Sequence, residues 1–396
     1  MTATNRVALA IQFAIIPLYG ALAGLAAETP GIPPLVPRPA AALIGLLALG
    51  ALIVTAPAAA RTFRRDWLTF AFLVPGLATI LNGVVGFDPA ASIGLGLLVT
   101  GIGAAGLYVA RRADAAMTRL ALRCFLWSGL AASLLALAMM LSRRPAGIYA
   151  YAHGRAIGTF LNPNELAAYT LIGLAVAVPL AVGSRGRDRL ATVCALVFLV
   201  TLAATFSRWG ALSAVCGVAV YAIVAKARVL LVAALVVALA GVALNAVAGA
   251  GHHNPRDDES RTVAWRTGWT TFQRFPLLGV GAFAYVKTYD EMRPPNAPGG
   301  RSAVAFDAHS LPISFAADGG IIAIVAAVMS FVILLRAALR AAGGAAAQPR
   351  MLAYALAAGM IALQIDGAIN MVSMVFPLSL QVAMLSLAVL RTDALR

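Results

Sequence analysis

The sequence predicts an all-α integral membrane protein with about 12 transmembrane helices. Of its 396 residues, 61% are hydrophobic and only 11% are charged. The apolar runs are continuous over roughly 20 residues, the length needed to cross a hydrocarbon layer about 30 Å thick. They lack the alternation of polar and apolar residues typical of a membrane-spanning barrel. Because backbone inside a bilayer must satisfy its own hydrogen bonds, these runs are expected to be helices.

The order of the apolar runs predicts three parts of the chain. Nine spans in residues 1–249 precede a loop with amphipathic helices in residues 250–308, and three more spans follow in residues 309–396. Hydropathy predicts the spans near 7–27, 40–60, 67–86, 89–110, 120–141, 165–183, 190–206, 209–225, 229–249, 309–335, 351–371 and 374–391. We interpret the first run as a true span and not as a cleaved signal peptide.

The distribution of basic residues predicts the orientation of these spans. If the N-terminus is cytoplasmic, alternate short loops contain half of the 30 Lys and Arg residues, in agreement with the positive-inside rule. The C-terminus is then cytoplasmic too, and the long loop faces outward. The residues in the cytoplasmic loops are Arg61, Arg64, Arg65, Arg111, Arg112, Arg119, Arg123, Arg185, Arg187, Arg189, Lys226, Arg228, Arg336, Arg340 and Arg350.

Composition also argues against several other classes of protein. The formal net charge is +15, but the basic residues are scattered as short clusters between spans, so nucleic acid is not expected as a partner. The three cysteines, Cys124, Cys194 and Cys216, lie inside apolar runs without metal-ligand spacing. We interpret them as core residues, and neither disulfides nor a zinc site are predicted.

Four arginines depart from the positive-inside pattern, because Arg143, Arg144, Arg155 and Arg208 fall on the predicted outer face. An arginine at the membrane edge costs a few kcal/mol, and a specific anionic partner is a common reason for its presence. Snorkelling to lipid headgroups and burial in an ion pair are the alternative interpretations.

The stretch RAIGTFLNPNELAAY connects one of these arginines to the start of a span. Pro163 favours a turn, and we expect the side chain of Asn164 to cap the sixth span. Asn162, Pro163 and Asn164 would then end a re-entrant approach and hold Arg155 at the membrane surface. Glu165 follows the turn and is expected to pair with an arginine.

The long loop is predicted to begin with an amphipathic helix whose start is capped by Asp257, Asp258 or Ser260. Trp265, Trp269 and Phe272 follow one another at i, i+4 and i+7, which places an apolar stripe on one face. The stripe favours either packing against the protein or a position at the membrane interface.

Two arginines lie close to this stripe. Arg261 precedes Trp265 by four residues, so both share one helical face, and Arg266 lies beside them. Arginines on such a helix are able to reach an anionic lipid headgroup.

The rest of the loop contains turns and a histidine. The segment GVGAFA resembles a dinucleotide-binding pattern but lacks a strand-helix-strand context, so we interpret its glycines as turn residues. RPPNAPGG is too rich in Pro and Gly for regular structure and predicts a mobile segment or lid. His309 is predicted at the mouth of the tenth span, with Asp307 two residues before it. It is either a base that accepts a proton from a hydroxyl or a structural histidine at a helix start.

Four segments in this order resemble the bacterial O-antigen ligase and O-antigen polymerase superfamily. They are GTFLNPNELAAY, FSRWGAL, SRTVAWRTGWTTFQRFPLLGVGAFAY and AHSLPISFAADGGI. The resemblance extends over residues 150–330, whereas the first 140 residues agree only in the number of spans. It implies a membrane-embedded glycosyltransferase of GT-C-like architecture in the bacterial inner membrane, with its active site on the periplasmic face.

The resemblance also implies partners and roles for particular residues. A glycan on undecaprenyl diphosphate is the implied donor, lipid A core or another glycan is the acceptor, membrane lipids surround the protein, and no cofactor or metal is required. Arg155, Arg208 and Arg261 correspond to the family's arginines around the diphosphate, and His309 corresponds to its histidine. Ser310 replaces the asparagine that often follows this histidine.

The residues themselves agree with this chemistry. Arginine side chains stabilise the charge of a departing diphosphate, and the neighbouring Arg266 would contribute. His309 would act as base, with its ring oriented by Asp307 or by a backbone group. Asn162, Asn164 and Glu165 would support the arginines. Asp366, at the outer end of the eleventh span, is either a second supporting residue or a structural one.

Several functions remain open at the level of sequence. A ligase and a polymerase differ in their acceptor, which these motifs do not separate, and we favour the ligase because the chain is compact. A protein O-glycosyltransferase of the same superfamily usually has a larger C-terminal part. A transporter for lipid-linked sugars would also need arginines in the membrane, but the sequence lacks internal repeats and its polar residues concentrate on one face.

Overall fold

The protein is described by a computed structural model, which covers residues 2–18, 38–160, 162–226, 255–282, 284–295, 308–370 and 375–392. All regular secondary structure in these ranges is helical, which confirms the predicted all-α class. The helices are α1 (Ala3–Ile15), η1 (Ile16–Leu18), α3 (Arg38–Ala60), α4 (Trp67–Val85), α5 (Pro89–Arg112), α6 (Ala115–Ser142), α7 (Ala146–Tyr151), α8 (Pro163–Gly183), α9 (Arg189–Ala204), α10 (Arg208–Val224), α12 (Pro255–Arg274), α13 (Tyr285–Met292), α14 (Leu311–Gly343), α15 (Ala347–Ile369) and α16 (Val375–Thr392).

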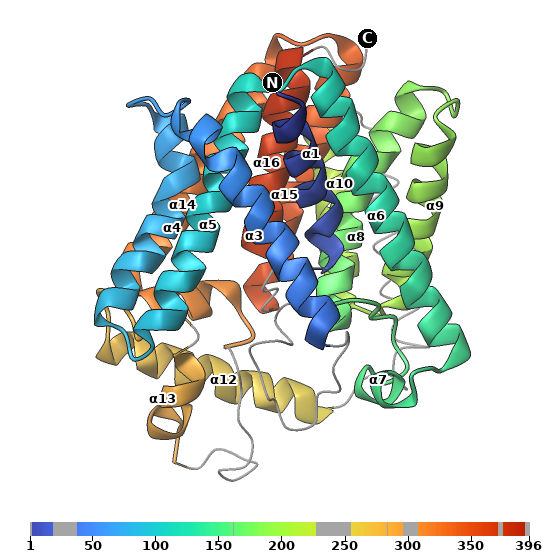
Figure 1. Cartoon of the computed structure of the whole chain (residues 1–396). Coiled ribbons are helices and arrows are strands. Elements are labelled where there is room, and N and C mark those ends of the chain that lie inside the picture. The colour runs from blue at the N-terminus through green and yellow to red at the C-terminus, as the bar shows by residue number, and fades with distance from the viewer. Residues whose placement is uncertain are drawn as a thin grey trace.

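The long helices form an upright bundle, and the helices of the predicted outer loop lie at one end of it (Figure 1). Helix α12 runs across that end, and α13 and the short helix α7 lie at the same end. The beginning of α1 and the end of α16 lie at the opposite end. The bundle therefore has one end that contains the chain termini and one end that contains α7, α12 and α13.

Polar side chains determine where several helices begin. Asp66, Asp88, Asp114 and Asp188 each accept a hydrogen bond from the backbone N–H three residues later, at 2.8–3.2 Å. These bonds satisfy N–H groups that have no partner within the helix, and acidic caps also favour the positive end of the helix dipole. The turns between consecutive helices can therefore be short.

The predicted spans agree with the helices wherever the structure describes them. Seven described helices are long and apolar enough to cross a membrane, and shorter apolar helices lie at Ala3–Leu18, Arg189–Ala204, Arg208–Val224 and Leu378–Arg391. The predicted ninth span, 229–249, lies outside the described residues. The molecule is thus a multi-pass helical protein by length and composition, while the total of 12 spans and the GT-C-like architecture stay predictions.

Burial within the bundle is what a membrane protein requires. Helices α8 and α15 are the most buried of the span-length helices, and α3 and α14 are among the least buried. Large apolar side chains face outward, for example Leu46, Leu196 and Val328 with 66%, 62% and 55% of their surface exposed. A soluble protein rarely exposes so many apolar side chains on all sides, so a lipid environment explains this surface.

One prediction about a helix boundary is wrong, and one helix has an interruption that was not predicted. Helix α12 begins at Pro255, so Asp257, Asp258 and Ser260 lie within its first turns and do not cap it. The predicted tenth span is confirmed as α14, but this helix is interrupted at Gly320, whose φ and ψ are 60° and −160°. The interruption could not be predicted from hydropathy, because hydropathy does not detect a break in the backbone inside an apolar run.

The face by which α12 packs also differs from the predicted stripe. Its buried residues are small, and a Cβ atom at Gly268 would lie only 2.6 Å from Ile313 Cγ2. Trp269 is 53% exposed, and its ring centroid lies 5.3 Å from the ring centroid of Phe272. Small residues allow α12 to approach α14 closely. Within the aromatic stripe, Trp269 is exposed, whereas Trp265 and Phe272 are half-buried.

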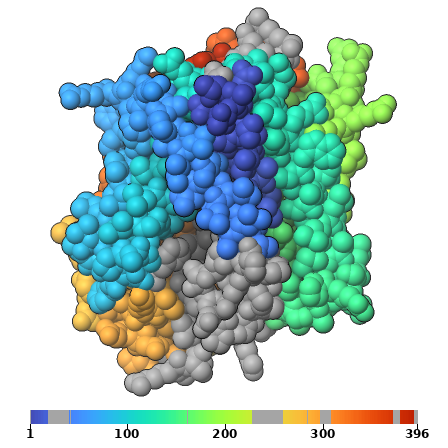
Figure 2. All heavy atoms as spheres, in the orientation of Figure 1, coloured from blue at the N-terminus to red at the C-terminus, as the bar shows by residue number. Residues whose placement is uncertain are grey.

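The turn predicted after Pro276 is confirmed, with Gly279 and Gly281 at φ values of 63° and 95°. Of the predicted lid, 293–300, residues 296–300 lie outside the described residues. Figure 2 shows α12 and α13, in yellow and orange, beneath the blue ends of α4 and α5.

Candidate functional site

Arg155 lies in a chain segment between α7 and α8 that is anchored on the end of α9. Its backbone neighbour Ala156 donates a hydrogen bond to the carbonyl oxygen of Ala204 at 3.0 Å. The Arg155 side chain is half-buried, and its Nε donates to the carbonyl oxygen of Thr205 at 2.6 Å. Its Nη2 donates to Oδ1 of Asn164 at 3.1 Å. The guanidinium is therefore held in one orientation by the ends of α8 and α9.

The asparagine that caps α8 in the Asn-Pro-Asn turn is not the predicted one. Asn162, and not Asn164, caps α8, because its Oδ1 accepts from the backbone N–H groups of Asn164 and Glu165 at 2.9 and 3.0 Å. Pro163 occupies the first helical position, which lacks an N–H partner in any case. The side chain of Asn164 is consequently available to other residues, and it accepts from both Arg155 and Ser207.

Ser207 connects this cluster to α10. Its hydroxyl donates to Oδ1 of Asn164 at 2.9 Å and accepts from the backbone N–H of Gly210 at 3.1 Å, so Ser207 is the N-cap of α10. Arg208 is the next residue and is exposed at the first position of that helix. A Cβ atom at Gly210 would lie 2.8 Å from Cβ of Ala167, which explains the glycine in the FSRWG segment. Arg155 and Arg208 are thereby brought to the same end of the bundle.

Glu165 lies in the first turn of α8 and is only 1% exposed. Burial raises the pKa of the Tyr151 phenol in α7, and the negative charge of Glu165 raises that pKa further. Glu165 therefore lies near α7 as well as near the cap of α8. Its pairing with an arginine stays a prediction.

A second cluster joins α12, α14 and α15. Trp265 Nε1 donates to the carbonyl oxygen of His309 at 3.3 Å, and Arg261 is close enough to Asp366 for an electrostatic interaction. The fully buried Asp366 accepts from Asn370 Nδ2 through Oδ1 at 3.0 Å. These contacts bring together three residues that are far apart in the sequence, namely Arg261, His309 and Asp366.

The backbone around His309 is held by contacts with two neighbouring helices. His309 has a φ of 47°, an uncommon value for a residue other than glycine, although histidine adopts it more often than most residues. The following residue, Ser310, donates through its hydroxyl to the carbonyl oxygen of Ala368 in α15 at 2.8 Å. The start of α14 is therefore attached to the end of α15 on one side and to α12 on the other.

The two clusters share one end of the molecule. Helix α10 packs along α15, and a Cβ atom at Gly217 would lie 3.1 Å from Cβ of Ala362. Because the two helices run in opposite directions, the beginning of α10 at Arg208 lies beside the end of α15, where Asp366 and Asn370 are located. The same end of the bundle contains α7 and α12 (Figure 1).

Two predicted site residues are not placed in these clusters. Arg266 is exposed on α12 and lies outside the contacts described above. Asp307 lies outside the described residues. Their predicted roles stay predictions.

Sequence reasoning missed several members of the clusters. Thr205 contributes only a backbone carbonyl, which every residue type has, so the sequence could not indicate this contact. Asn370 follows Asp366 by four residues, and this i, i+4 spacing of two polar residues in an apolar helix was a usable signal. Ser207 precedes Arg208 directly and has the composition of a helix cap.

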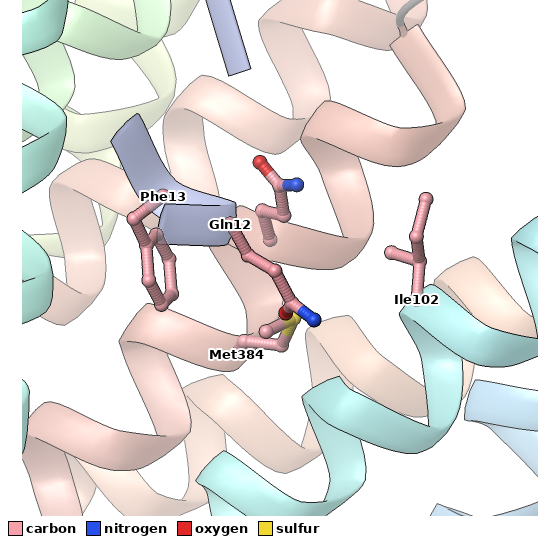
Figure 3. Close-up of a pocket in the computed structure, with 5 residues that line it drawn as sticks. Gln12, Phe13, Ile102 and Met384 are labelled. Atoms are coloured by element: carbon pink, nitrogen blue, oxygen red, sulfur yellow. The ribbon is translucent and has the colours of Figure 1, made fainter. Parts of the chain in front are cut away.

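A small pocket inside the bundle is separate from these clusters. It is lined by Gln12 and Phe13 of α1, Ile102 of α5, and Gln381 and Met384 of α16 (Figure 3). None of these residues belongs to the two clusters at the end of the bundle. We therefore do not assign the candidate site to this pocket.

Fold and site together define a multi-pass helical membrane protein with arginines, a histidine and a buried carboxylate gathered at one end. Residues 193–328 match the family described as O-Antigen ligase. This segment runs from α9 into α14 and includes Arg208, Arg261 and His309. The match confirms the predicted O-antigen ligase superfamily for this segment, and it supports a membrane enzyme of the ligase or polymerase type. No curated protein sequence matches the chain significantly.

Proposed function

We propose that the protein transfers a glycan from undecaprenyl diphosphate to a sugar hydroxyl of lipid A core at the periplasmic face of the bacterial inner membrane. The reaction proceeds without a metal and inverts the configuration at the anomeric carbon. Residues 1–249 and 309–396 form the membrane part in this proposal, and residues 250–308 form the periplasmic loop. Both termini are cytoplasmic.

The observation that supports this function best is the convergence of Arg155, Arg208, Arg261 and His309 at one end of the bundle. These residues come from four separate segments, and hydrogen bonds orient Arg155 and the backbone of His309. A purely structural membrane subunit needs cations at the cytoplasmic end for its orientation, but it has no need for cations gathered at the end opposite to the basic loops. A lipid-linked diphosphate, in contrast, requires several fixed cations at the membrane surface.

The arginines stabilise the leaving group in this proposal. The acceptor hydroxyl oxygen attacks the anomeric carbon while the bond between that carbon and the diphosphate oxygen breaks. Arg155, Arg208 and Arg261, assisted by Arg266, bind the diphosphate, whose negative charge increases as it departs. The guanidinium of Arg155, already held by protein hydrogen bonds, reorganises little when that charge develops.

His309 accepts the proton of the attacking hydroxyl. A neutral imidazole suits this role near neutral pH. Asp366 supports Arg261 through its negative charge, and Asp307 orients His309. Asn162, Asn164 and Glu165 keep Arg155 in place through the start of α8.

The alternative acceptor is another lipid-linked glycan, which would make the protein an O-antigen or exopolysaccharide polymerase. The same residues would perform the same chemistry, and only the acceptor would differ. The single loop of moderate length, residues 250–308, favours the ligase. A transporter of lipid-linked sugars is a less favoured alternative, because it would not need a base beside the arginines.

Reconstitution tests this proposal. Purified protein in liposomes is given undecaprenyl-diphosphate glycan in the presence of EDTA, with or without lipid A core. We expect glycan on lipid A core, and we expect His309→Ala to reduce the rate by 10²-fold or more, as the loss of a general base does. Arg155→Ala should abolish transfer, while Arg112→Ala, at the opposite end of the bundle, should not change it.

The outcomes separate the alternatives. Lengthening of the lipid-linked glycan without lipid A core would identify a polymerase. A His309→Ala variant as active as the wild type would exclude His309 as the base. Loss of wild-type activity with EDTA would disprove the metal-independent reaction.

A further inference from the structure

The interruption of α14 at Gly320 has an unusual neighbour, the turn that follows α12. A break in an apolar helix leaves backbone N–H and C=O groups without their usual partners, which is costly away from water. The turn Pro276–Gly281 supplies partners for these groups. We call residues 276–281 and 317–322 together the joint.

Four backbone hydrogen bonds hold the joint. Before the interruption, the carbonyl oxygens of Ala317 and Asp318 accept from the N–H groups of Val280 and Gly281 at 3.0 and 2.8 Å. After it, the N–H groups of Ile321 and Ile322 donate to the carbonyl oxygens of Pro276 and Leu277 at 2.8 and 3.4 Å. The turn is therefore inserted into the helix and replaces its missing hydrogen bonds.

The joint and the residues that follow it are also attached to the turn between α4 and α5 and to the start of α5. The Phe87 N–H donates to the carbonyl oxygen of Val280 at 2.8 Å, and the Ser92 hydroxyl donates to that of Ala282 at 3.2 Å. Lys287 of α13 forms an ion pair with Asp88 at 2.7 Å. The joint consequently has a fixed position relative to the bundle.

Glycines allow three backbone segments to meet at the joint. A Cβ atom at Gly279 would collide with the backbone of Asp318 and Gly319, and one at Gly320 would collide with the backbone of Leu277. A Cβ atom at Gly86 would lie 2.8 Å from the carbonyl oxygen of Val280. The φ and ψ of Gly320 also belong to a region that only glycine adopts without strain.

The first part of α14 is held alongside α12 at two places. At its start, the carbonyl oxygen of His309 accepts from Trp265 of α12. At its end, the turn directly after α12 fills the interruption. Gly268 lies between these places and packs against Ile313. The joint thus determines how the segment with His309 lies relative to α12, which contains Arg261.

We infer that the joint positions His309 for the transfer reaction, with Gly279 and Gly320 as positioning residues that do not touch the substrate. This inference rests on the proposed function. A methyl group at either glycine forces the turn and α14 apart, and a displacement near 1 Å at the reacting groups lowers a rate by about 10²-fold. Binding of the donor to the arginines should change much less.

The test compares Gly279→Ala and Gly320→Ala with Gly343→Ala, a control at the far end of α14 where a Cβ atom meets no neighbour. We expect the first two variants to lower kcat by 10- to 100-fold with a donor KM within about threefold of the wild type. Gly343→Ala should retain the wild-type kcat and KM. An unchanged kcat in Gly279→Ala and Gly320→Ala would overturn the inference.

A second measurement does not depend on the reaction. The rate at which diethyl pyrocarbonate modifies His309, followed by mass spectrometry, should change in Gly279→Ala and Gly320→Ala and stay constant in Gly343→Ala. If the wild type transfers no glycan, the proposed function fails and these modification rates alone decide the inference. Equal rates in all four proteins would overturn it.

A milder variant applies if the glycine variants do not fold. Ser92→Ala keeps the Cβ atom and removes only the hydroxyl that donates to Ala282. This variant should change the His309 modification rate and kcat in the same direction as Gly279→Ala and Gly320→Ala do, but by a smaller factor. No change in either quantity would contradict the role of the joint.

Discussion

Arg155 depends on acceptors from the ends of other helices. The carbonyl oxygen of Thr205 and Oδ1 of Asn164 accept from its guanidinium, and the same Oδ1 also accepts from the Ser207 hydroxyl. One amide oxygen therefore orients the guanidinium and connects it to the cap of α10. At the scale of single residues, Asn164 is the side chain whose loss should reveal how far this orientation matters.

We expect Asn164→Leu to lower kcat/KM for glycan transfer by about 10- to 150-fold, because a hydrogen bond to a charged group contributes about 1.5–3 kcal/mol. Leucine keeps a similar volume and favours the helix. Asn5→Leu is the matched control, since Asn5 is also half-buried with one side-chain bond, from Nδ2 to Tyr108 Oη at 3.2 Å, and lies near the opposite end of the bundle. Equal activity of the two variants would mean that Asn164 does not orient Arg155.

Helices α4 and α5 form the wall to which the joint is attached, and they pack through glycines. Gly76 and Gly83 of α4, like Gly96 and Gly103 of α5, are seven residues apart and so share a helical face. A Cβ atom at Gly103 would overlap the carbonyl oxygen of Phe72, and one at Gly96 would lie 2.8 Å from that of Gly76. Such close approach replaces the hydrophobic driving force that is missing between helices in lipid.

We expect Gly103→Ala to lower the free energy of unfolding by about 1–3 kcal/mol, the usual cost of overpacking a tight interface. Gly94→Ala on the same helix is the control, because a Cβ atom there meets no neighbour. This control should leave stability unchanged or raise it slightly, since alanine favours helix. Thermal unfolding in detergent measures both, and similar melting temperatures for the two variants would argue against close packing at Gly103.

The start of α6 gives a prediction about pH. A hydrogen bond from the Met117 N–H lowers the pKa of Asp114 below its ordinary value of 3.8, opposed by burial and assisted by the charge of Arg6. Because the pKa is lower in the folded protein, the stabilisation is complete well above the ordinary pKa of 3.8 and disappears as the pH falls through the folded pKa. The difference in melting temperature between wild type and Asp114→Ala should therefore be larger at pH 7 than at pH 3. A constant difference would contradict the role of the charge.

At the scale of the whole molecule, the distribution of charge and the arrangement of helices agree. Arginines predicted to share one side lie in the turns after α3 and α8 and in the helices on either side of the turns after α5 and α14. These four turns lie at the end that contains the start of α1 (Figure 1). The candidate site lies at the other end. If the positive-inside rule holds for this chain, the site faces the periplasm.

Cysteine labelling tests this orientation. In a variant with alanine at the three native cysteines, Glu291→Cys in α13 should react with a membrane-impermeant maleimide on intact spheroplasts. Arg187→Cys, between α8 and α9, should react only after lysis. Both positions are exposed, so access and not burial decides the result. The reverse pattern would place the site in the cytoplasm.

Much of the fold could be predicted from the sequence because its determinants are local. Continuous apolar runs predicted the described long helices, and half of the basic residues predicted which loops share an end. The turn at Gly279 and Gly281 was predicted because glycines follow Pro276 there. The interruption at Gly320 was not, because its missing hydrogen bonds are replaced by a turn about 40 residues earlier in the chain.

The candidate site was likewise predicted from the sequence only in part. The sequence by itself determined which residues are unusual, because Arg155, Arg208, Arg261 and His309 stand out against an apolar chain and match one family in order. Only the tertiary structure decided that Asn162 caps α8 while Asn164 contacts Arg155, and that Arg261 lies near Asp366. Helix formation and membrane insertion depend on neighbouring residues along the chain, whereas these contacts depend on how helices pack across the bundle.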